Sequence, residues 1–300
     1  MLVWLSEELA ARVAPRPGSR FVVYPGADAA GRDEAPEVFV PPQPPDEPTL
    51  DALSSLRGLR LVQALNSGVD RYVGRVPRGV VLCNALQAEP TAEVAMSLIL
   101  GVLNHVPRWV VEQRRAHWSD PGPRPRLAAR TVAIVGAGAV GRALARILSG
   151  FDVEVVLLGR TERPGVRSLE DLPEVAGRAD VLVLAVPLAP RTHGLVDRAL
   201  LARMRDGAMI VNVARGPVVD TAALLAETSS GRLLAGLDVT DPEPLPPDHP
   251  LWSCPGVLIS PHVGANTADF WARAARLIDD QLARVTLGVP LCYQVDVRQG

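Results

Sequence analysis

In the middle of the chain the sequence reads Thr131-Val-Ala-Ile-Val-Gly136-Ala-Gly138-Ala139-Val140-Gly141, an apolar strand followed by a glycine-rich turn and the start of an apolar helix. Each of the three glycines has its own role: Gly136 permits a tight turn, Gly138 lets the backbone approach a pyrophosphate, and Gly141 lets the helix pack against the strand. The backbone N–H groups of Ala139 and Val140 would face an anion at the positive end of the helix. A bare glycine turn is possible, but strand, turn and helix together predict a dinucleotide-binding loop.

The strand after this helix, Val153–Leu158, ends in Gly159-Arg160-Thr161-Glu162-Arg163. A site for NAD usually has an acidic residue at this strand end, where it accepts hydrogen bonds from the ribose 2′-hydroxyl. Here Gly159 stands there instead, and Arg160 could pair with a 2′-phosphate to which Thr161 could also donate. The alternative is that both arginines are ordinary surface charges and that Glu162 binds a ribose hydroxyl. NADP is therefore the preferred prediction over NAD, with NAD left open.

Short apolar runs alternate with helical patterns along the whole chain, which predicts an α/β fold with mainly parallel sheets. A length of 300 residues suits about two domains. The first third should hold five strands, at Leu2–Trp4, Phe21–Tyr24, Val38–Val40, Arg60–Ala64 and Val80–Cys83. A second α/β series begins after Asn84, where Thr91 is expected to cap a long apolar helix reaching about Val106, with an arginine-rich helix following to Trp118.

Composition excludes several classes of protein. The chain is 48% hydrophobic and 21% charged, as in globular domains, and its formal net charge of -2 leaves no basic surplus for nucleic acid or an anionic membrane surface. All 31 basic residues are arginine. Without lysine the chain cannot form Schiff bases, bind pyridoxal phosphate covalently or build a Walker-A or kinase-type site.

The cysteines and the N-terminus indicate a cytoplasmic protein. Cys83, Cys254 and Cys292 lie far apart in the sequence, so they offer neither a disulfide framework nor a metal site. The N-terminus lacks the basic region of a signal peptide. The longest apolar run, Val94–Leu103, has about half the ~20 residues that a membrane-spanning helix needs, so no membrane partner is expected.

Three later segments place polar side chains after expected strands. They are Asn212-Val-Ala-Arg215-Gly-Pro-Val-Val-Asp220, Leu237-Asp238-Val-Thr-Asp-Pro-Glu243-Pro-Leu245 and Ser260-Pro-His262-Val-Gly264. Ligands of open α/β sheets bind at the carboxyl ends of the strands, so the three segments can converge on one crevice. Each residue also has a structural alternative, since Arg215 could pair with Asp220, and Glu243 could be solvated between its prolines.

Together with the glycine loop, Ala179–Thr192 and Pro250-Leu-Trp252, these segments resemble the D-isomer-specific 2-hydroxyacid dehydrogenase family. The similarity is dense from about Leu127 to Thr267 and fainter before residue 90. The resemblance implies two lobes, a Rossmann-like dinucleotide-binding domain (89–267) inserted in a flavodoxin-like substrate domain formed by residues 1–88 and by a C-terminal helix and tail, 268–300. It also implies a homodimer.

The resemblance implies a catalytic trio of Arg215, Glu243 and His262, and the chemistry of these side chains agrees with it. A guanidinium can bind the carboxylate and the carbonyl of a 2-oxo acid together. An imidazole can supply or remove the proton on the carbonyl oxygen near neutral pH, and a neighbouring carboxylate orients the ring and favours its charged form. Substrate contacts are implied at Arg215, His262 and the loop Ser67, Gly68 and Val69. Further cofactor contacts are implied at Val186, Pro187, Thr192, Val213, Ala214, Asp238 and Gly264.

The expected function is hydride transfer between NAD(P)H and a small 2-oxo acid or D-2-hydroxy acid. Formate dehydrogenases carry glutamine where this chain has Glu243, and phosphite dehydrogenases need a lysine, which is absent. The strand end at Gly159-Arg160-Thr161 resembles the NADPH-preferring glyoxylate and hydroxypyruvate reductases. The alternative is a dinucleotide-sensing binding protein like the family's transcriptional corepressors, which keep the same trio; turnover of cofactor with a 2-oxo acid would separate the two.

Overall fold

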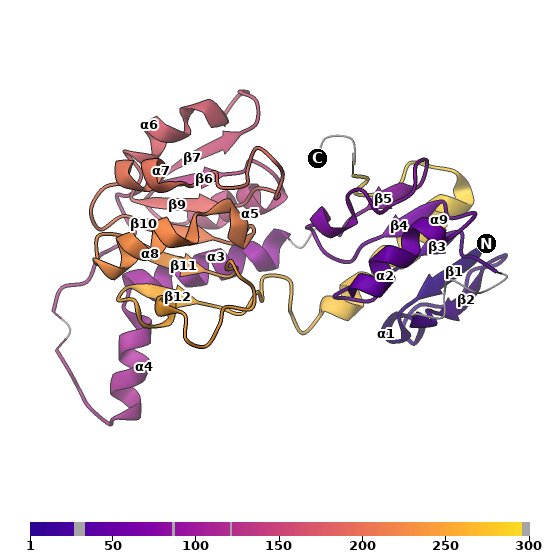
Figure 1. The fold of residues 1–300 in the computed structure, drawn as a ribbon, viewed down its shortest axis with the longest axis horizontal. Coiled ribbons are helices and arrows are strands. Elements are labelled where there is room, and N and C mark those ends of the chain that lie inside the picture. The colour runs from indigo at the N-terminus through magenta and orange to yellow at the C-terminus, as the bar shows by residue number, and fades with distance from the viewer. Residues whose placement is uncertain (27–33, 86–87, 121, 296–300) are drawn as a thin grey trace. The chain divides into compact units, whose positions relative to one another are not determined.

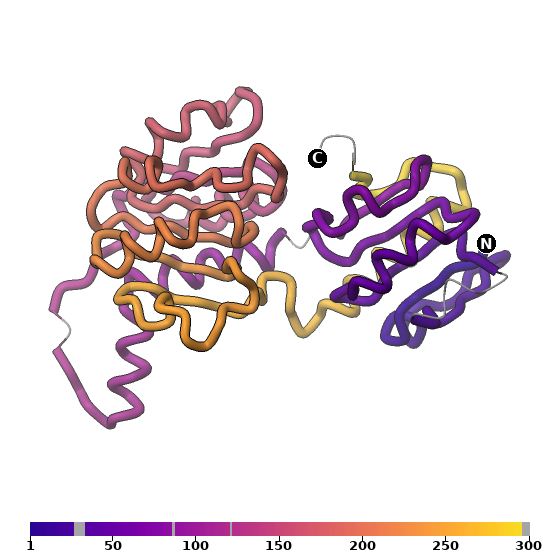
Figure 2. Tube along the Cα trace, viewed as in Figure 1, coloured from indigo at the N-terminus to yellow at the C-terminus, as the bar shows by residue number. Residues whose placement is uncertain are grey.

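A computed structural model describes residues 1–26, 34–85, 88–120 and 122–295 (Figure 1). The chain divides into two compact units, and the trace in Figure 2 shows that one of them uses both ends of the chain. Unit 1 consists of Met1–Gln87 with Asn266–Gly300, and unit 2 consists of Ala88–Ala265. The α/β fold predicted from the sequence is confirmed, and the two units are described one at a time.

Unit 2 is built on a seven-stranded sheet in which every neighbouring pair is parallel, in the order β12-β11-β10-β9-β6-β7-β8. The strands are β6 (Thr131–Val135), β7 (Glu154–Gly159), β8 (Arg167–Ser168), β9 (Val181–Leu184), β10 (Met209–Asn212), β11 (Leu234–Leu237) and β12 (Val257–Ile259). The order reverses direction at β6, the first strand of the series, as in the Rossmann arrangement. Ligands of such sheets bind at the carboxyl ends of the strands beside this reversal.

Helices cover both faces of this sheet, so its strands are almost continuously apolar. The helices are α3 (Ala88–Leu103), α5 (Ala139–Leu148), α6 (Leu172–Ala176), α7 (Arg198–Arg203) and α8 (Thr221–Ser229). One apolar cluster joins alternate strand residues to α3 and α5, and a second cluster joins the other residues of the same strands to α6, α7 and α8. The short elements β8 and α6 have no periodicity long enough to be predicted from the sequence.

The expected cap at Thr91 is wrong. Helix α3 begins at Ala88, because Pro90 is well tolerated in the first turn of a helix and the residues before Thr91 are already helical. The hydroxyl of Thr91 instead donates to the carbonyl oxygen of Gly264 at 3.3 Å. A side chain expected to begin a helix therefore holds the turn that follows β12.

The helix after α3 is shorter than the sequence suggested. The backbone turns at His105, whose φ of +56° lies in the left-handed region, and α4 runs from Val106 to Arg114 instead of to Trp118. No side chain of α4 is buried. Across the described ranges, no single helix is long and apolar enough to cross a membrane; α3 and α4 satisfy that test only as a pair bent by 67°.

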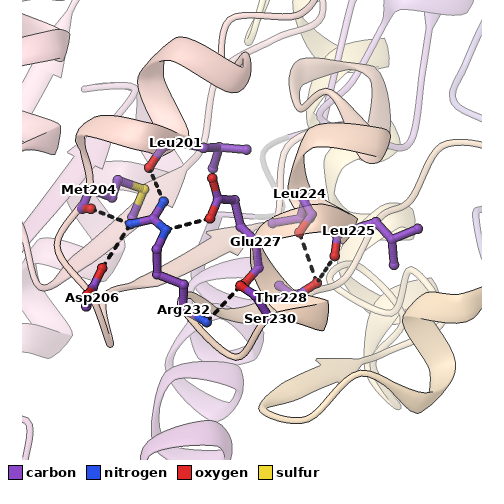
Figure 3. A network of polar contacts seen from close by, with 9 residues as sticks. All are labelled: Leu201, Met204, Asp206, Leu224, Leu225, Glu227, Thr228, Ser230 and Arg232. Atoms are coloured by element: carbon purple, nitrogen blue, oxygen red, sulfur yellow. Dashed lines mark hydrogen bonds and ion pairs between the residues drawn. The ribbon is translucent and has the colours of Figure 1, made fainter.

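Arg232, just before β11, joins the ends of two helices of unit 2 (Figure 3). Its guanidinium donates to the carbonyl oxygens of Leu201 and Met204, each at 2.7 Å, where α7 ends. It also pairs with Glu227 in the last turn of α8, and the hydrogen bond to that carboxylate is the main reason why the pKa of Arg232 is raised. One side chain thus donates to two carbonyl oxygens at the end of α7, of which that of Leu201 also accepts the N–H of Met204 at 3.1 Å.

Unit 1 contains a five-stranded parallel sheet in the order β2-β1-β3-β4-β5, the flavodoxin-like order. Its elements are β1 (Leu2–Leu5), α1 (Glu7–Ala10), β2 (Arg20–Val23), β3 (Val38–Phe39), α2 (Glu47–Ala52), β4 (Leu61–Gln63), β5 (Val81–Cys83) and α9 (Phe270–Leu287). Helix α9 packs Phe270, Ala274, Ile278 and Leu282 into the core of the sheet. A buried hydrogen bond of 2.7 Å from Gln281 to Gln63 fastens α9 to β4.

Candidate active site

The register of the unit 2 sheet brings the predicted segments to one edge. Val135, Leu184, Asn212, Leu237 and Ile259 are partners across consecutive strands and form a single row. The glycine loop and the three polar segments begin within a few residues of this row. Their side chains therefore gather at the carboxyl edge of the sheet, as the sequence predicted.

The glycine loop has the geometry that a dinucleotide requires. Gly136 has a φ of +119°, and a Cβ there would overlap the carbonyl oxygen of Ala185; a Cβ on Gly141 would overlap the carbonyl oxygen of Gly136. Gly138, which precedes α5, differs because nothing lies within 4 Å of the position of its Cβ. The outer glycines are therefore required by packing, whereas the middle one leaves open space at the start of a helix. Open space beside the first residues of a helix, here Ala139 and Val140, is what a pyrophosphate would need.

The end of β7 lies beside this loop. Gly159 is buried, while Arg160, Thr161 and Glu162 are exposed. The guanidinium of Arg163 donates to the carbonyl oxygen of Ala137, in the glycine loop, at 3.2 Å. The turn after β7 is therefore attached to the loop expected to hold the pyrophosphate.

Glu243 and His262 form a close pair. Nδ1 of His262 lies 2.6 Å from Oε1 of Glu243. The side chain of His262 is 44% exposed and that of Glu243 is 41% exposed. The hydrogen bond that the ring donates to Glu243 is the largest cause of the raised pKa of His262, whereas desolvation and the charge of Arg215 lower that pKa. The same hydrogen bond lowers the pKa of Glu243, with a smaller contribution from Arg215. An ionised carboxylate can only accept, so Nδ1 carries the shared proton and Nε2 is left to exchange a proton with a ligand.

His262 is held in an uncommon backbone conformation by Asp238. The φ of His262 is +52°, in the left-handed region that few non-glycine residues adopt. Its N–H donates to the carbonyl oxygen of Asp238 at 2.8 Å. The carboxylate of Asp238, only 2% exposed, accepts hydrogen bonds from the Ser260 hydroxyl (2.7 Å), Val263 N–H (2.9 Å) and Gly264 N–H (3.0 Å).

Asp238 therefore grips the turn on both sides of the histidine. A carboxylate has about four acceptor positions, so three bonds leave capacity for one further donor. Sequence reasoning missed Ser260 as a partner of this carboxylate. In the sequence Ser260 is only a serine two residues before the histidine. Its contact with Asp238 arises because β11 and β12 pair side by side.

Arg215 follows β10 in a turn fixed by Asn212, which is 1% exposed. The Asn212 amide donates to the carbonyl oxygen of Arg215 at 2.9 Å and accepts from Ala214 N–H at 3.0 Å. The Arg215 guanidinium donates to the carbonyl oxygen of Ala214 at 2.7 Å. Asp220, the alternative partner considered from the sequence, caps α8 by accepting from Ala223 N–H at 2.9 Å. The charge of Arg215 lowers the pKa values of both Glu243 and His262, so Arg215 lies within electrostatic reach of the pair.

The remaining cofactor residues predicted in unit 2 lie on the loops after the same strands. Thr192 closes the loop after β9, donating to the carbonyl oxygen of Pro187 at 2.6 Å and accepting from Ala189 N–H at 2.8 Å. Val186 and Pro187 lie between β9 and this closure, Val213 and Ala214 follow β10, and Gly264 follows β12. No group of three or more potential metal ligands occurs within the ranges that the structure covers.

The predicted substrate loop Ser67–Val69 belongs to unit 1, where it follows β4. The Ser67 hydroxyl donates to the carbonyl oxygen of Ala85 at 3.1 Å, and the Asn84 amide donates to the carbonyl oxygen of Ser67 at 2.8 Å. The Asn66 amide donates to the carbonyl oxygen of Gly68 at 2.6 Å. The two asparagines, which the sequence reading did not single out, thus fix the shape of the loop.

Fold and site together define a class of protein. Unit 2 is a Rossmann-type sheet whose glycine loop has room for a pyrophosphate, and the same sheet edge carries an imidazole–carboxylate pair within electrostatic reach of an arginine. These groups can bind a carboxylate-bearing carbonyl compound and exchange a proton with it beside a dinucleotide. The class is that of the nicotinamide-dinucleotide-dependent dehydrogenases.

Known proteins agree with this assignment. The family described as D-isomer specific 2-hydroxyacid dehydrogenase, NAD binding domain, matches residues 96–264. A mouse (Mus musculus) glyoxylate reductase/hydroxypyruvate reductase is 35% identical over 244 residues, which make up 74% of this chain and 72% of the mouse protein.

Solved structures resemble the whole chain. An NADPH-dependent glyoxylate/hydroxypyruvate reductase from Sinorhizobium meliloti, in complex with NADP and sulfate, has a TM-score of 0.85 and 28% identity, covering 99% of this chain and 98% of that one. A D-isomer specific 2-hydroxyacid dehydrogenase from Xanthobacter autotrophicus Py2, in complex with NADPH and MES, has a TM-score of 0.81 and 30% identity, covering 100% and 99%.

The chain belongs to the D-isomer specific 2-hydroxyacid dehydrogenase family. It is an oxidoreductase that uses a nicotinamide dinucleotide and acts on a CH–OH group by hydride transfer, which confirms the family and the reaction type predicted from the sequence. These relatives give no support to the corepressor alternative.

Proposed function

We propose that the protein is an NADPH-dependent reductase of small 2-oxo acids of the glyoxylate and hydroxypyruvate type. The observation that carries the proposal is the pairing of His262 with Glu243 at the sheet edge, within electrostatic reach of Arg215. The names of the mouse and Sinorhizobium relatives support this substrate class.

Each residue has a defined task in this proposal. Bound dinucleotide supplies the hydride in reduction and accepts it in oxidation. Arg215 holds the carboxylate and the carbonyl oxygen of the 2-oxo acid with its guanidinium fork. His262 donates the proton from Nε2 to the carbonyl oxygen during reduction and removes it in the reverse reaction, while Glu243 keeps Nδ1–H oriented. The Ser67–Val69 loop binds the substrate carboxylate, and Asp238 offers its remaining acceptor position to the cofactor.

Steady-state kinetics with a panel of 2-oxo acids tests the reaction and its acid. We expect His262→Ala to lower kcat by about 10²–10⁴-fold, the usual contribution of general acid–base catalysis. Affinity for the reduced cofactor should stay within about twofold, because the glycine loop is untouched. His249→Ala is the matched control, since His249 only caps the short helix Pro250–Ser253. Wild-type kcat in His262→Ala would remove this residue from the mechanism.

The cofactor preference is proposed to depend on Arg160 and Thr161, with Ala139 and Val140 binding the pyrophosphate. A charge-assisted hydrogen bond from Arg160 to a 2′-phosphate contributes roughly 1.5–3 kcal/mol, and exposure of the side chain favours the lower end. Arg160→Ala should therefore weaken NADPH about tenfold and leave NADH nearly unchanged. Titrations of both reduced cofactors test this, with Arg178→Ala as the control for a lost surface arginine. Tighter binding of NADH than NADPH by the wild type would refute the proposal.

A homodimer is proposed as well. The side chains of Val106, Trp109, Val110 and Val111 on α4 are all at least 36% exposed, an unusual apolar density for a surface helix. A second copy of the chain would cover this face. Sedimentation should give a dimer for the wild type and a monomer for Trp109→Arg; a monomeric wild type would refute the proposal. The cytoplasm remains the proposed location.

A further inference from the structure

Gly159, the last residue of β7, lies where a side chain would collide with Val166. A Cβ built on Gly159 would lie 2.9 Å from Cγ1 of Val166 and 3.5 Å from the Cβ of Ala137. Carbon atoms that are not bonded attract each other best at about 3.5–4.0 Å, so the first distance is strongly repulsive. An acidic residue at position 159 therefore requires Val166 to move.

Val166 has little freedom to move. It is only 4% exposed, and its β-branched side chain has few rotamers available. Its backbone is tied to Arg163 by two hydrogen bonds: Val166 N–H donates at 2.8 Å and Arg163 N–H donates in return at 3.0 Å. The chain then pairs with β7 through β8, with Gly159 opposite Ser168. The valine is thus fixed on both sides.

The turn that carries Val166 also carries the residues proposed to bind the 2′-phosphate. Arg160 and Thr161 lie at its start, and the Arg163 guanidinium fastens it to the carbonyl oxygen of Ala137 in the glycine loop. Val166 is therefore buried against a strand end without a Cβ, while Arg160 and Arg163 of the same turn are exposed. Position 159 lacks a side chain and Val166 fills the space that such a side chain would take.

We propose that Val166 is a specificity-determining residue: its side chain fills the space that an acidic residue at position 159 would need, and so excludes the ribose-binding acid of an NAD site. The proposal rests on the NADPH preference proposed above. It implies that Gly159→Asp alone cannot convert the enzyme to NADH, whereas Gly159→Asp with Val166→Ala can, because removing both methyl groups opens the space.

The test is a cycle of variants: wild type, Gly159→Asp, Val166→Ala and the double variant. Dissociation constants for NADH and NADPH, from quenching of protein fluorescence, are measured together with melting temperatures. We expect Gly159→Asp to melt at a lower temperature and to gain less than twofold in NADH affinity. The double variant should bind NADH about tenfold more tightly than Gly159→Asp does, and Val166→Ala alone should change neither affinity more than about twofold.

The matched control is Gly159→Asp combined with Val196→Ala, which shortens a different buried valine, one whose backbone bridges to Val219. This control should not gain NADH affinity. Equal NADH affinities in Gly159→Asp and the double variant would overturn the role of Val166. A wild type that prefers NADH would instead refute the proposed cofactor, so the two failures are distinguishable.

A smaller substitution keeps the proposal testable if the aspartate variants do not fold. Gly159→Ala adds only the Cβ and should lower the melting temperature of the wild type. In a Val166→Ala background the same substitution should have little effect. An equal loss in both backgrounds would show that Val166 does not restrict position 159.

Discussion

Replacing Glu243 by glutamine removes the charge that faces His262 and keeps the size of the side chain. In the wild type the 2.6 Å contact with Glu243 raises the pKa of His262. The proton-donating form of the ring therefore persists to higher pH than in an isolated histidine. The glutamine can still accept a hydrogen bond from Nδ1–H, so the variant tests charge more than orientation.

The sign of the pH effect follows from the direction of that pKa shift. Reduction needs a protonated ring, and its rate falls as pH rises through the pKa of His262. With the carboxylate charge removed, the pKa falls and this decline begins at lower pH. Oxidation needs a neutral ring, so its rise also begins at lower pH, but its maximum is reduced because the ring has become a weaker base.

The magnitude follows from the strength of a charge-assisted hydrogen bond, about 1.5–3 kcal/mol. Both side chains are more than 40% exposed, and solvent screening places the effect at the lower end. Since about 1.4 kcal/mol corresponds to a factor of ten in rate, kcat for oxidation should fall about tenfold.

Rates in both directions are measured by nicotinamide absorbance from pH 5 to pH 10. Glu170→Gln, which changes an exposed carboxylate outside the site, is the control and should match the wild type. If Glu243→Gln kept the wild-type pH profile, the carboxylate would have no electrostatic role. A profile displaced to higher pH would contradict the sign of the argument.

Three further substitutions test other parts of unit 2. Arg215→Lys replaces a guanidinium fork by a point charge, so kcat/KM for a 2-oxo acid should fall more than tenfold at unchanged cofactor affinity; wild-type kinetics would exclude Arg215 from substrate binding. Asp238→Asn replaces one carboxylate oxygen by an amide NH₂ group, which cannot accept the hydrogen bond that Val263 N–H or Gly264 N–H donates to that oxygen, so kcat should fall about 10–100-fold. An unchanged kcat would mean that the His262 turn does not need these hydrogen bonds. Arg232→Met removes the hydrogen bonds to the carbonyl oxygens of Leu201 and Met204 and the ion pair with Glu227, so the melting temperature should fall by about 4–8 °C, from a loss of about 2 kcal/mol, with kcat unchanged; a melting temperature within a degree of the wild type would refute that role.

Local patterns of the sequence predicted the strand, the turn and the helix around the glycine loop, since each of them leaves its own signature within a few residues. The parallel sheet then aligns those strand ends automatically, which explains why three separate segments meet at one edge. The resemblance to the family indicated that Glu243 and His262 act together, and the two side chains do form a close pair.

Contacts between distant segments could not be predicted in this way. The Asp238 carboxylate finds Ser260 only once β11 and β12 lie side by side, and the clash between position 159 and Val166 exists only in the folded turn. Thr91 misled the prediction because threonine often caps helices, although Pro90 permits an earlier start. Local propensity here gave way to tertiary contacts with Gly264.

The use of both chain ends in unit 1 affects the order of events during synthesis on the ribosome. The core of unit 1 includes Phe270, Ala274, Ile278 and Leu282, which are translated only after all of unit 2. Unit 2 is one continuous segment and can bury its sheet as soon as Ala265 has emerged, whereas the β-strands of unit 1 must wait for α9 to cover them. In the nascent chain unit 2 can therefore fold while unit 1, whose strands are made first, still waits for its last helix. The apolar face of β1, β3 and β4 is the surface that most needs protection in that interval.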